Sequence, residues 1–330
     1  MPIARTVLPT DLVALVSYDG RVYPNEAETR DRIGSRKSAP HPLESALEQW
    51  FSFATGRHTW ISVKGATLRG MVSARRRGAR SAWEVECLID ATEGDESVLL
   101  SLFDEAMAEA GRKGVEKVFL RLAADSGILP LARKAGFVPY KSEHLYYYEG
   151  PQAVRGTAAE SLPLRRRTRQ DLYPLYQLYN AAVPEPVRRT EAATFNEWVA
   201  AQERHWLGAR STQLVLEEGK PAPERMSESM QPAGRLTASL RAAREGEIGR
   251  FDLLVHPTRF QAADTLVAAA MARLARASTL FVLVPAYMEP VARALARRGF
   301  QQGPEFVALA KRTTVPLKMP QLAPAGLKQA

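Results

Sequence analysis

Leu-Ala-Arg-Lys-Ala-Gly-Phe at residues 131–137 and Leu-Ala-Arg-Arg-Gly-Phe at residues 295–300 are two versions of one short segment. Each is typical of a helix end, because glycine is common just beyond a helix C-terminus. The two glycines, Gly136 and Gly299, are 163 residues apart. Two further pairs recur at similar offsets: Asp11-Leu12 with Asp171-Leu172 at 160 residues, and Ala106-Met107 with Ala270-Met271 at 164 residues. The chain therefore contains two copies of one unit.

The repeats predict two domains joined by a linker. We expect a first domain at residues 1–150 and a second at residues 164–316, followed by a loose tail at residues 317–330. Residues 151–163 combine Gly, Pro, Ala and polar residues without a period, which is typical of a linker. Residues 217–234 are polar and proline-rich and predict a loop inside the second repeat.

The composition of the 330 residues is that of a globular protein with enough apolar material for two cores. Apolar residues are 45% and charged residues 25% of the chain. The longest apolar runs fall far short of the roughly 20 residues that cross a bilayer, and the N-terminus shows no secretory signal. The single cysteine, Cys87, has no internal disulfide partner and is expected to be buried. We expect a cytoplasmic protein.

The net charge of +9 lies entirely in the second half of the chain. Residues 1–150 carry 20 basic and 20 acidic side chains, whereas the rest carry 25 basic and 16 acidic ones. A positive field favours an anionic partner, such as a phosphate-bearing cofactor, an acidic protein or nucleic acid. A genome-wide bias toward arginine is the alternative explanation. The basic cluster Arg165–Arg167 lacks interleaved aromatic residues, which weakens the nucleic-acid hypothesis.

The periodicity of apolar residues predicts the same order of elements in both repeats. In the first repeat it predicts helices from Asp11 and at 42–53, 97–110 and 130–135, and strands at 59–63, 68–74, 83–89, 117–122 and 144–148. In the second it predicts helices at 171–180, 194–207, 265–275 and 290–298, and strands at 213–216, 236–242, 247–255, 280–284 and 305–314. The fold class is α/β, an α/β sandwich in which helices flank a mixed, mostly antiparallel sheet.

This order of elements resembles the GNAT superfamily of acyl-CoA-dependent N-acetyltransferases, and the resemblance covers nearly the whole chain. Phe-Asp-Leu-Leu-Val-His-Pro at residues 251–257 is similar to the family's fourth strand running into its cofactor loop. Residues 294–300 resemble its last helix and the Gly-Phe turn, and residues 131–137 resemble the same turn in the first repeat. The resemblance implies two tandem acetyltransferase-type domains, packed through their sheets or first helices, and acetyl transfer from acetyl-CoA to an amine.

The family binds the cofactor's pyrophosphate at a helix start, through a loop patterned Arg/Gln-x-x-Gly-x-Gly/Ala. In the first repeat the corresponding loop, residues 90–97, reads Asp-Ala-Thr-Glu-Gly-Asp-Glu-Ser. Each carboxylate within a few ångströms of a phosphate costs roughly 1–4 kcal/mol, so four of them predict that this degenerate loop does not bind acetyl-CoA. The simpler reading of these acids is compensation of the partial positive charge at the helix start.

The corresponding loop of the second repeat, residues 258–265, is degenerate but not acidic. It reads Thr-Arg-Phe-Gln-Ala-Ala-Asp-Thr, without glycine and with an unfavourable Asp264. By the resemblance, the cofactor contacts lie in this domain only and come from Leu254, Val255, Arg259, Phe260, Gln261, Ala262, Ala263 and Thr265. The alternative is a structural loop whose helix is capped by Asp264 or Thr265.

The catalytic groups are less distinct. The family often uses a glutamate on the fourth strand and a tyrosine four residues before the glycine of the Gly-Phe turn. That tyrosine position is Ala132 in the first repeat and Leu295 in the second, so Tyr287 is the nearest substitute. Glu245, Glu247 and Asp252 are candidates for the base, and we select Glu247, with a solvated glutamate at a strand edge as the alternative.

Three hypotheses for the function follow. The first is an N-acyltransferase that uses acetyl-CoA in the second repeat and acts on a small-molecule or peptide amine. The second is a non-catalytic binding or regulatory protein, a pseudoenzyme that keeps the fold, and the third is a nucleic-acid-binding protein. The five histidines show no metal-ligand spacing, so no metal is expected. The stripe Tyr173, Tyr176 and Tyr179 is read as packing, with a ligand groove as the alternative.

Overall fold

The structure is a computed structural model that describes residues 4–6, 23–30, 32–33, 56–65, 67–78, 81–92, 94–150, 164–202, 211–217 and 235–314. Several predicted features lie outside the described residues. They are the helices expected from Asp11 and at residues 42–53, the linker at residues 151–163, nearly all of the proline-rich loop and the C-terminal tail.

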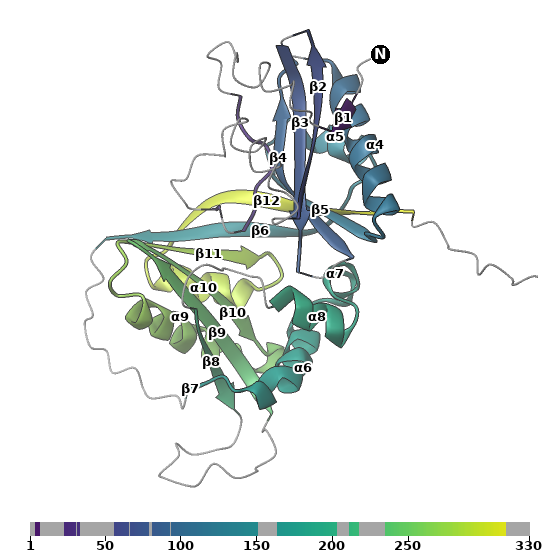
Figure 1. Cartoon of the computed structure of the whole chain (residues 1–330). Helices are drawn as coiled ribbons and strands as arrows, with labels where there is room; N and C mark the ends of the chain where they lie inside the picture. The colour runs from purple at the N-terminus through teal and green to yellow at the C-terminus, as the bar shows by residue number, and fades with distance from the viewer. Residues whose placement is uncertain are drawn as a thin grey trace, which may run out of the picture.

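The first repeat forms a meander of strands followed by two helix–strand units (Figure 1). Its strands are β1 (Ala4–Thr6), β2 (Arg57–Lys64), β3 (Thr67–Arg76), β4 (Ala82–Asp90), β5 (Lys117–Ala123) and β6 (Val138–Glu149). Its described helices are α4 (Glu96–Arg112) and α5 (Leu129–Lys134). The predicted elements that fall on described residues are all present, β1 is additional, and β6 starts earlier than the strand expected at 144–148.

The second repeat follows the same order with more helix before the meander. Its strands are β7 (Leu164–Arg166), β8 (Thr212–Glu217), β9 (Leu236–Glu245), β10 (Ile248–Val255), β11 (Thr279–Pro285) and β12 (Gln301–Arg312). Its helices are η2 (Arg169–Asp171), α6 (Leu172–Ala182), α7 (Glu185–Glu191), α8 (Phe195–Gln202), η3 (Pro257–Arg259), α9 (Ala262–Arg273) and α10 (Glu289–Arg297). The short β7, α7, η2 and η3 were not predicted, and α9 begins three residues before the helix expected at 265–275. The other elements match the expected order.

The duplicated Gly-Phe segment forms the same helix-ending turn twice. Gly136 and Gly299 have φ angles of +88° and +84°, which glycine adopts without strain. The N–H of Phe137 donates to the Ala132 carbonyl at 3.0 Å, and the N–H of Phe300 donates to the equivalent carbonyl of Leu295 at 3.1 Å. This pattern caps the last turn of each helix and directs the following phenylalanine into the core.

The described strands form one sheet of twelve, in the order β1-β2-β3-β4-β5-β12-β6-β11-β10-β9-β8-β7. The last strand of each repeat lies in the sheet of the other. Strand β12 pairs with β5, with Arg312 opposite Lys117, and β6 pairs with β11, with Glu149 opposite Thr279. Strands β6 and β12 also pair with each other. The two repeats are therefore joined through a continuous sheet, as expected, but by exchange of strands (Figure 1).

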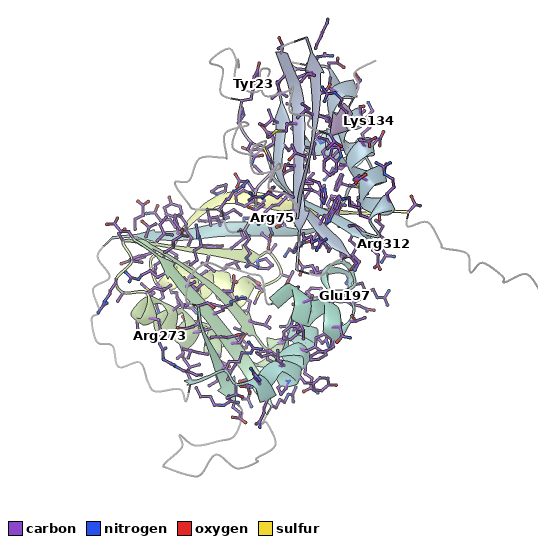
Figure 2. All side chains as sticks on the ribbon, viewed as in Figure 1. Tyr23, Arg75, Lys134, Glu197, Arg273 and Arg312 are labelled. Atoms are coloured by element: carbon purple, nitrogen blue, oxygen red, sulfur yellow. The ribbon has the colours of Figure 1, made fainter. Side chains whose placement is uncertain are left out.

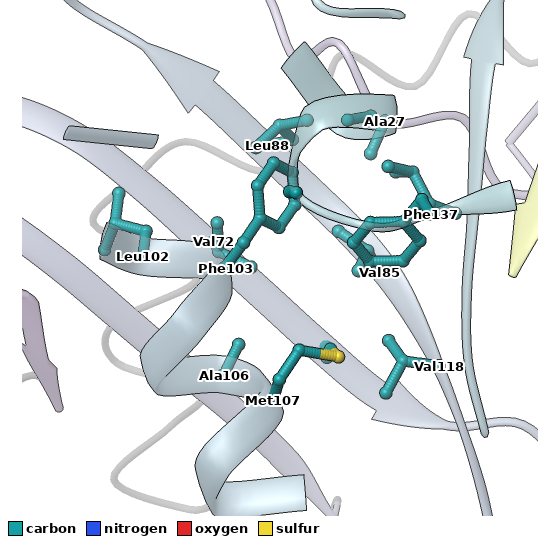
Figure 3. Packing of buried hydrophobic residues seen from close by; sticks show 14 of the residues in the cluster. Ala27, Val72, Val85, Leu88, Leu102, Phe103, Ala106, Met107, Val118 and Phe137 are labelled. Carbon is teal, nitrogen blue, oxygen red and sulfur yellow. The ribbon is translucent and has the colours of Figure 1, made fainter. Parts of the chain in front are cut away.

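Each repeat has a separate core between the sheet and its two later helices. In the first repeat, α4 and α5 cover a cluster that includes Phe103 and Phe137, whose ring centroids are 5.3 Å apart (Figure 3). In the second repeat, α9 and α10 cover the corresponding cluster around Phe251 and Phe300. A third cluster lies beneath α6, α7 and α8. The first repeat's other sheet face carries a smaller cluster, against which Tyr23 packs (Figure 2).

Candidate active site

Two pairs of parallel strands in the sheet diverge soon after they meet. Strand β4 pairs with β5 only from Ala82 to Glu84, and β10 pairs with β11 only from Ile248 to Arg250. Beyond these residues the facing backbone N–H and C=O groups need other partners. We call the space between β4 and β5 the first gap and the space between β10 and β11 the second gap. They occupy equivalent places in the two repeats.

An extended segment near the N-terminus, residues 23–30, fills the first gap. On the β4 side, the N–H of Glu26 donates to the Leu88 carbonyl at 2.9 Å. On the β5 side, the N–H of Glu28 donates to the Arg121 carbonyl at 2.9 Å. The Asn25 side chain adds two bonds to β4: its Oδ1 accepts from the Leu88 N–H at 2.8 Å, and its Nδ2 donates to a carbonyl at 3.0 Å. The segment thus supplies the pairing that the two strands do not give each other.

Buried side chains hold this segment in place. Ala27 and Thr29 are fully buried. Arg32, just beyond the segment, donates from Nη1 to the Glu86 carbonyl at 2.6 Å, and its guanidinium lies 3.5 Å from the Glu86 carboxylate. Glu86 is itself buried and also pairs with Arg57 at 2.7 Å. An extended ligand can enter the first gap only by displacing residues 23–30.

The start of α4, next to the first gap, is occupied by the protein's own carboxylate. Asp95 is the N-cap residue, and its Oδ1 accepts hydrogen bonds from the Ser97 N–H and hydroxyl. The Ser97 hydroxyl and Arg69, which lies 2.7 Å away, hold the pKa of Asp95 below its ordinary value. Because a helix start attracts one anion most strongly at its cap, this carboxylate takes the position that a phosphate needs. The acidic loop therefore serves as a helix cap.

The second gap is lined differently. The His256 N–H donates to the Thr237 carbonyl of β9 at 2.8 Å. Along an antiparallel pair, residues whose backbone groups bond to the neighbouring strand alternate with residues whose backbone groups point away from it. The N–H and C=O groups of Leu253 and Val255 therefore point away from β9 and into the second gap. At the apex of this gap, Arg30 donates from Nη2 to Asp252 Oδ1 at 2.6 Å and to the Leu283 carbonyl of β11 at 3.3 Å.

The start of α9, next to the second gap, has no side-chain cap. Its N-cap residue, Gln261, makes no capping hydrogen bond and is exposed. Asp264, the acid of the first turn, pairs with Arg297 of α10 at 2.5 Å. On the other side of the loop, Arg235 contacts the His256 ring at 3.1 Å. The charge of Asp264 is thus neutralised by Arg297, and the His256 ring, which Arg235 contacts, caps η3 by accepting from the Thr258 N–H.

The structure brings the predicted cofactor residues together at this end of the second gap. Leu254 and Val255 end β10, and Arg259, Phe260, Gln261, Ala262, Ala263 and Thr265 follow through η3 into the first turn of α9. Arg259 and Phe260 are exposed. Ala262 and Ala263 are buried, so their small side chains let the helix start pack closely on the sheet.

Glu247, the base selected from the sequence, lies at the other end of β10. It is exposed in the turn before the strand, and its carbonyl accepts from the N–H groups of Ser278 and Thr279. At about 3.3 Å per residue, Glu247 is about 26 Å from Val255 along the strand. The apolar periodicity of the sequence predicted the strand β10, but it did not show at which end β10 separates from β11. Among the three carboxylates considered, Asp252 is the one beside the second gap.

The two positions that correspond to the family's tyrosine are buried in the cores. Ala132 and Leu295 are both fully buried. Tyr287 follows β11 by two residues, and it packs against the same cluster as Leu254 from the end of β10. Its side chain therefore lies where the two strands of the second gap end. Burial raises the pKa of the Tyr287 hydroxyl, so this group keeps its proton at neutral pH.

A network of buried charges lies beside Tyr287, where the two repeats meet. Lys141 on β6 lies 2.9 Å from Glu143 and 2.7 Å from Glu191 of α7. Arg121 of β5 donates from Nε to Glu143 at 2.9 Å. Burial alone would raise the pKa of Glu191, but the neighbouring cations, Lys141 first, bring it to about 2. Each buried charge in this network has an opposite charge beside it, as burial requires.

Other sequence features have structural roles. Cys87 is buried as predicted, and burial raises the pKa of its thiol to about 12. Arg165 pairs with Asp171 at 2.6 Å and with Glu217 at 3.1 Å. The tyrosine stripe packs on α8, with the Tyr176 and Phe195 rings 5.3 Å apart.

Within the described ranges, no cluster of His, Cys, Asp or Glu could hold a metal, and no helix has the length and apolar character to span a membrane.

Comparison with solved structures identifies the fold. The chain is similar to a tandem GNAT protein from the clavulanic acid biosynthesis pathway, with a TM-score of 0.50 and 16% identity over 93% of this chain and 94% of that one. It is also similar to a GCN5-related N-acetyltransferase from Sphaerobacter thermophilus, with a TM-score of 0.55 and 14% identity over 95% and 96% of the two chains. No protein-family model and no curated protein matches the sequence. The chain therefore has the tandem GNAT fold.

Proposed function

We propose that the protein is an acyl-CoA-dependent N-acyltransferase whose acyl-CoA site is the second gap. The observation that supports this is the contrast between the two gaps. The first gap is filled by residues 23–30, and Asp95 caps the helix beside it. In the second gap, the backbone groups of Leu253 and Val255 lie beyond the register in which β10 pairs with β11, and Gln261, the N-cap residue of α9, makes no side-chain capping hydrogen bond. The names of the two similar structures, both GNAT proteins, support acetyl-CoA as the ligand.

The groups around the second gap fit an extended ligand that ends in a diphosphate. The backbone of Leu253 and Val255 can pair with the amides of a pantetheine arm. The start of α9, with Arg259 and Gln261 beside it, suits phosphate because helix starts and arginine side chains both favour anions. The first gap does not fit, because residues 23–30 already satisfy its backbone groups.

The chemistry assigned to this chain is proton transfer and orientation. Acetyl-CoA, when bound, supplies the acyl group as a thioester. Asp252 accepts a proton from the ammonium group of the acceptor, so that the free amine can attack. Tyr287, a phenol that is protonated at neutral pH, would donate its proton to the departing sulfur, and the second proton lost by the attacking nitrogen would restore the phenol through solvent. The acceptor is an amine, carried by a small molecule or a peptide.

The test is calorimetric titration of the full chain with acetyl-CoA. We expect one site per chain. Gln261→Glu adds a carboxylate at the helix start of α9 and should weaken binding about fivefold or more, since one charge pair at this range is worth about 1 kcal/mol even in water. The matched control is Glu96→Gln, which removes an acid from the first turn of α4 and should leave binding unchanged. Absence of heat at millimolar acetyl-CoA would refute the site.

The alternative is a protein that binds acetyl-CoA without turnover. It is favoured by the buried Ala132 and Leu295, which leave both family tyrosine positions without a proton donor. A panel of small amines and peptides, incubated with labelled acetyl-CoA, separates the two functions. Labelled product that disappears in Asp252→Asn supports catalysis. Binding by calorimetry with no product on any acceptor supports the non-catalytic function.

A further inference from the structure

One segment of the chain contacts both gaps. Residues 23–30 bond to β4 through Leu88 and to β5 through Arg121, and thereby fill the first gap. Arg30, the last residue of this segment, then reaches Asp252 of β10 and the Leu283 carbonyl of β11. Three residues later Ile33 packs in a buried cluster with Leu283. The N-terminal segment of the first repeat therefore forms part of the second gap.

The two acids that this segment contacts are equivalent in the two repeats. The last paired residues are Glu84 in β4 and Arg250 in β10, and the acids Glu86 and Asp252 each follow two residues later. Each acid pairs with an arginine at or just beyond the end of this segment: Arg32, two residues past it, lies 3.5 Å from Glu86, and Arg30 lies 2.6 Å from Asp252. The pairs differ in exposure, because the Glu86 side chain is 3% exposed whereas that of Asp252 is 24% exposed.

This difference in exposure separates the roles of the two arginines. Glu86 is buried, so its arginine partners are needed for the stability of the first repeat. The pair of Arg30 and Asp252 is partly exposed, with Arg30 28% exposed, and such pairs contribute little to stability. Arg30 nevertheless links the facing sides of the second gap at its apex, through one carboxylate on β10 and one carbonyl on β11.

We propose that Arg30 is a positioning residue for acyl transfer in the second repeat: it fixes the carboxylate of Asp252 and the spacing of β10 and β11 at the apex of the second gap. The inference rests on the proposed function. Arg30 occupies Asp252 Oδ1, and a carboxylate offers about four acceptor positions, so Asp252 can hold the arginine and still take a proton from an amine. The first repeat, whose own gap is filled, thus completes the active site of the second.

The experiment compares Arg30→Met with Arg32→Met in the full chain. A displacement of about 1 Å in a reacting group can lower the rate about 100-fold, so Arg30→Met should lower kcat roughly 10- to 100-fold. The dissociation constant of acetyl-CoA should stay within about twofold, because the helix start and the backbone of β10 are unchanged. Arg30→Lys, or guanidinium ions added to Arg30→Met, should restore part of kcat. Arg32→Met should lower the thermal midpoint more than Arg30→Met and leave kcat of the folded protein unchanged.

A second measurement does not depend on activity. By hydrogen exchange, Arg30→Met should speed exchange in β10 and β11 near Asp252 and Leu283, whereas Arg32→Met should affect β4 near Glu86. Unchanged kcat and unchanged exchange in Arg30→Met overturn the positioning role while leaving the proposed function intact. A wild-type protein that does not bind acetyl-CoA overturns the proposed function, and this inference with it.

Discussion

Asp95 and Gln261 are the N-cap residues of α4 and α9, the equivalent helices of the two repeats, and only Asp95 accepts a hydrogen bond from its own helix. The same difference extends to the gaps beside them, since residues 23–30 fill the first, whereas in the second the backbone of Leu253 and Val255 lies beyond the paired register of β10 and β11. The two halves of one duplicated fold have therefore diverged at the position where an anion would bind.

The capping role of Asp95 predicts a loss of stability on its removal. Asp95→Ala leaves the Ser97 N–H without its partner and should lower the thermal midpoint by about 2–4 °C. Gln261→Ala, at the uncapped helix, is the matched control and should change the midpoint by less than about 1 °C. Circular dichroism melts measure both, and equal losses in the two variants would contradict the assignment.

The proton donor assigned to Tyr287 predicts a loss of rate without a loss of binding. Tyr287→Phe removes only the hydroxyl and should lower kcat about 100-fold, the usual contribution of a positioned acid. The affinity for acetyl-CoA, measured by calorimetry, should be unchanged. Tyr173→Phe removes an exposed hydroxyl from α6 and serves as the control. A Tyr287→Phe variant with full activity would exclude this residue as the acid.

The buried network between the repeats predicts a large effect of one lysine. Lys141→Met leaves Glu191 without its nearest cation and removes one of the two cations that lie 2.9 Å from Glu143. Losing one partner of a buried ion pair costs about 3–5 kcal/mol. Lys134→Met breaks the exposed pair with Glu96 and should cost less than about 1 kcal/mol. Urea unfolding of the two variants compares them, and similar costs would argue against the network.

His58 predicts a dependence of stability on pH. Its ring stacks on Trp83 at 4.5 Å, and burial lowers its pKa from about 6.5 to about 4. Since the folded pKa lies below the unfolded one, the unfolded state binds the proton first. The contribution of His58 is therefore complete above pH 6.5 and is lost as the pH falls toward 4. Urea unfolding at pH 7 and pH 5 should show a smaller difference for His58→Asn than for the wild type.

The sequence predicted features that depend on local pattern. The Gly-Phe turns, the helices they end and the strands of both meanders follow from periodicity and from the conformational freedom of Gly136 and Gly299. The contacts made by Asn25 were not predictable, because its partner Glu86 is 61 residues away and residues 23–30 show no period. The exchange of β6 and β12 is equally non-local. Helix α9 has its N-cap at Gln261, three to four residues before the cap predicted at Asp264 or Thr265. The sequence also did not show that β10 separates from β11 at its Val255 end, away from Glu247.

The exchanged strands make the two halves inseparable as folding units. If a protease severs the chain between residues 150 and 164, the two fragments should still migrate together in gel filtration, because β12 stays hydrogen-bonded to β5, and β6 to β11. A fragment ending at residue 150, made alone, exposes an unpaired edge along β5 and should aggregate. On this architecture, neither repeat can close its own sheet without a strand that the other provides.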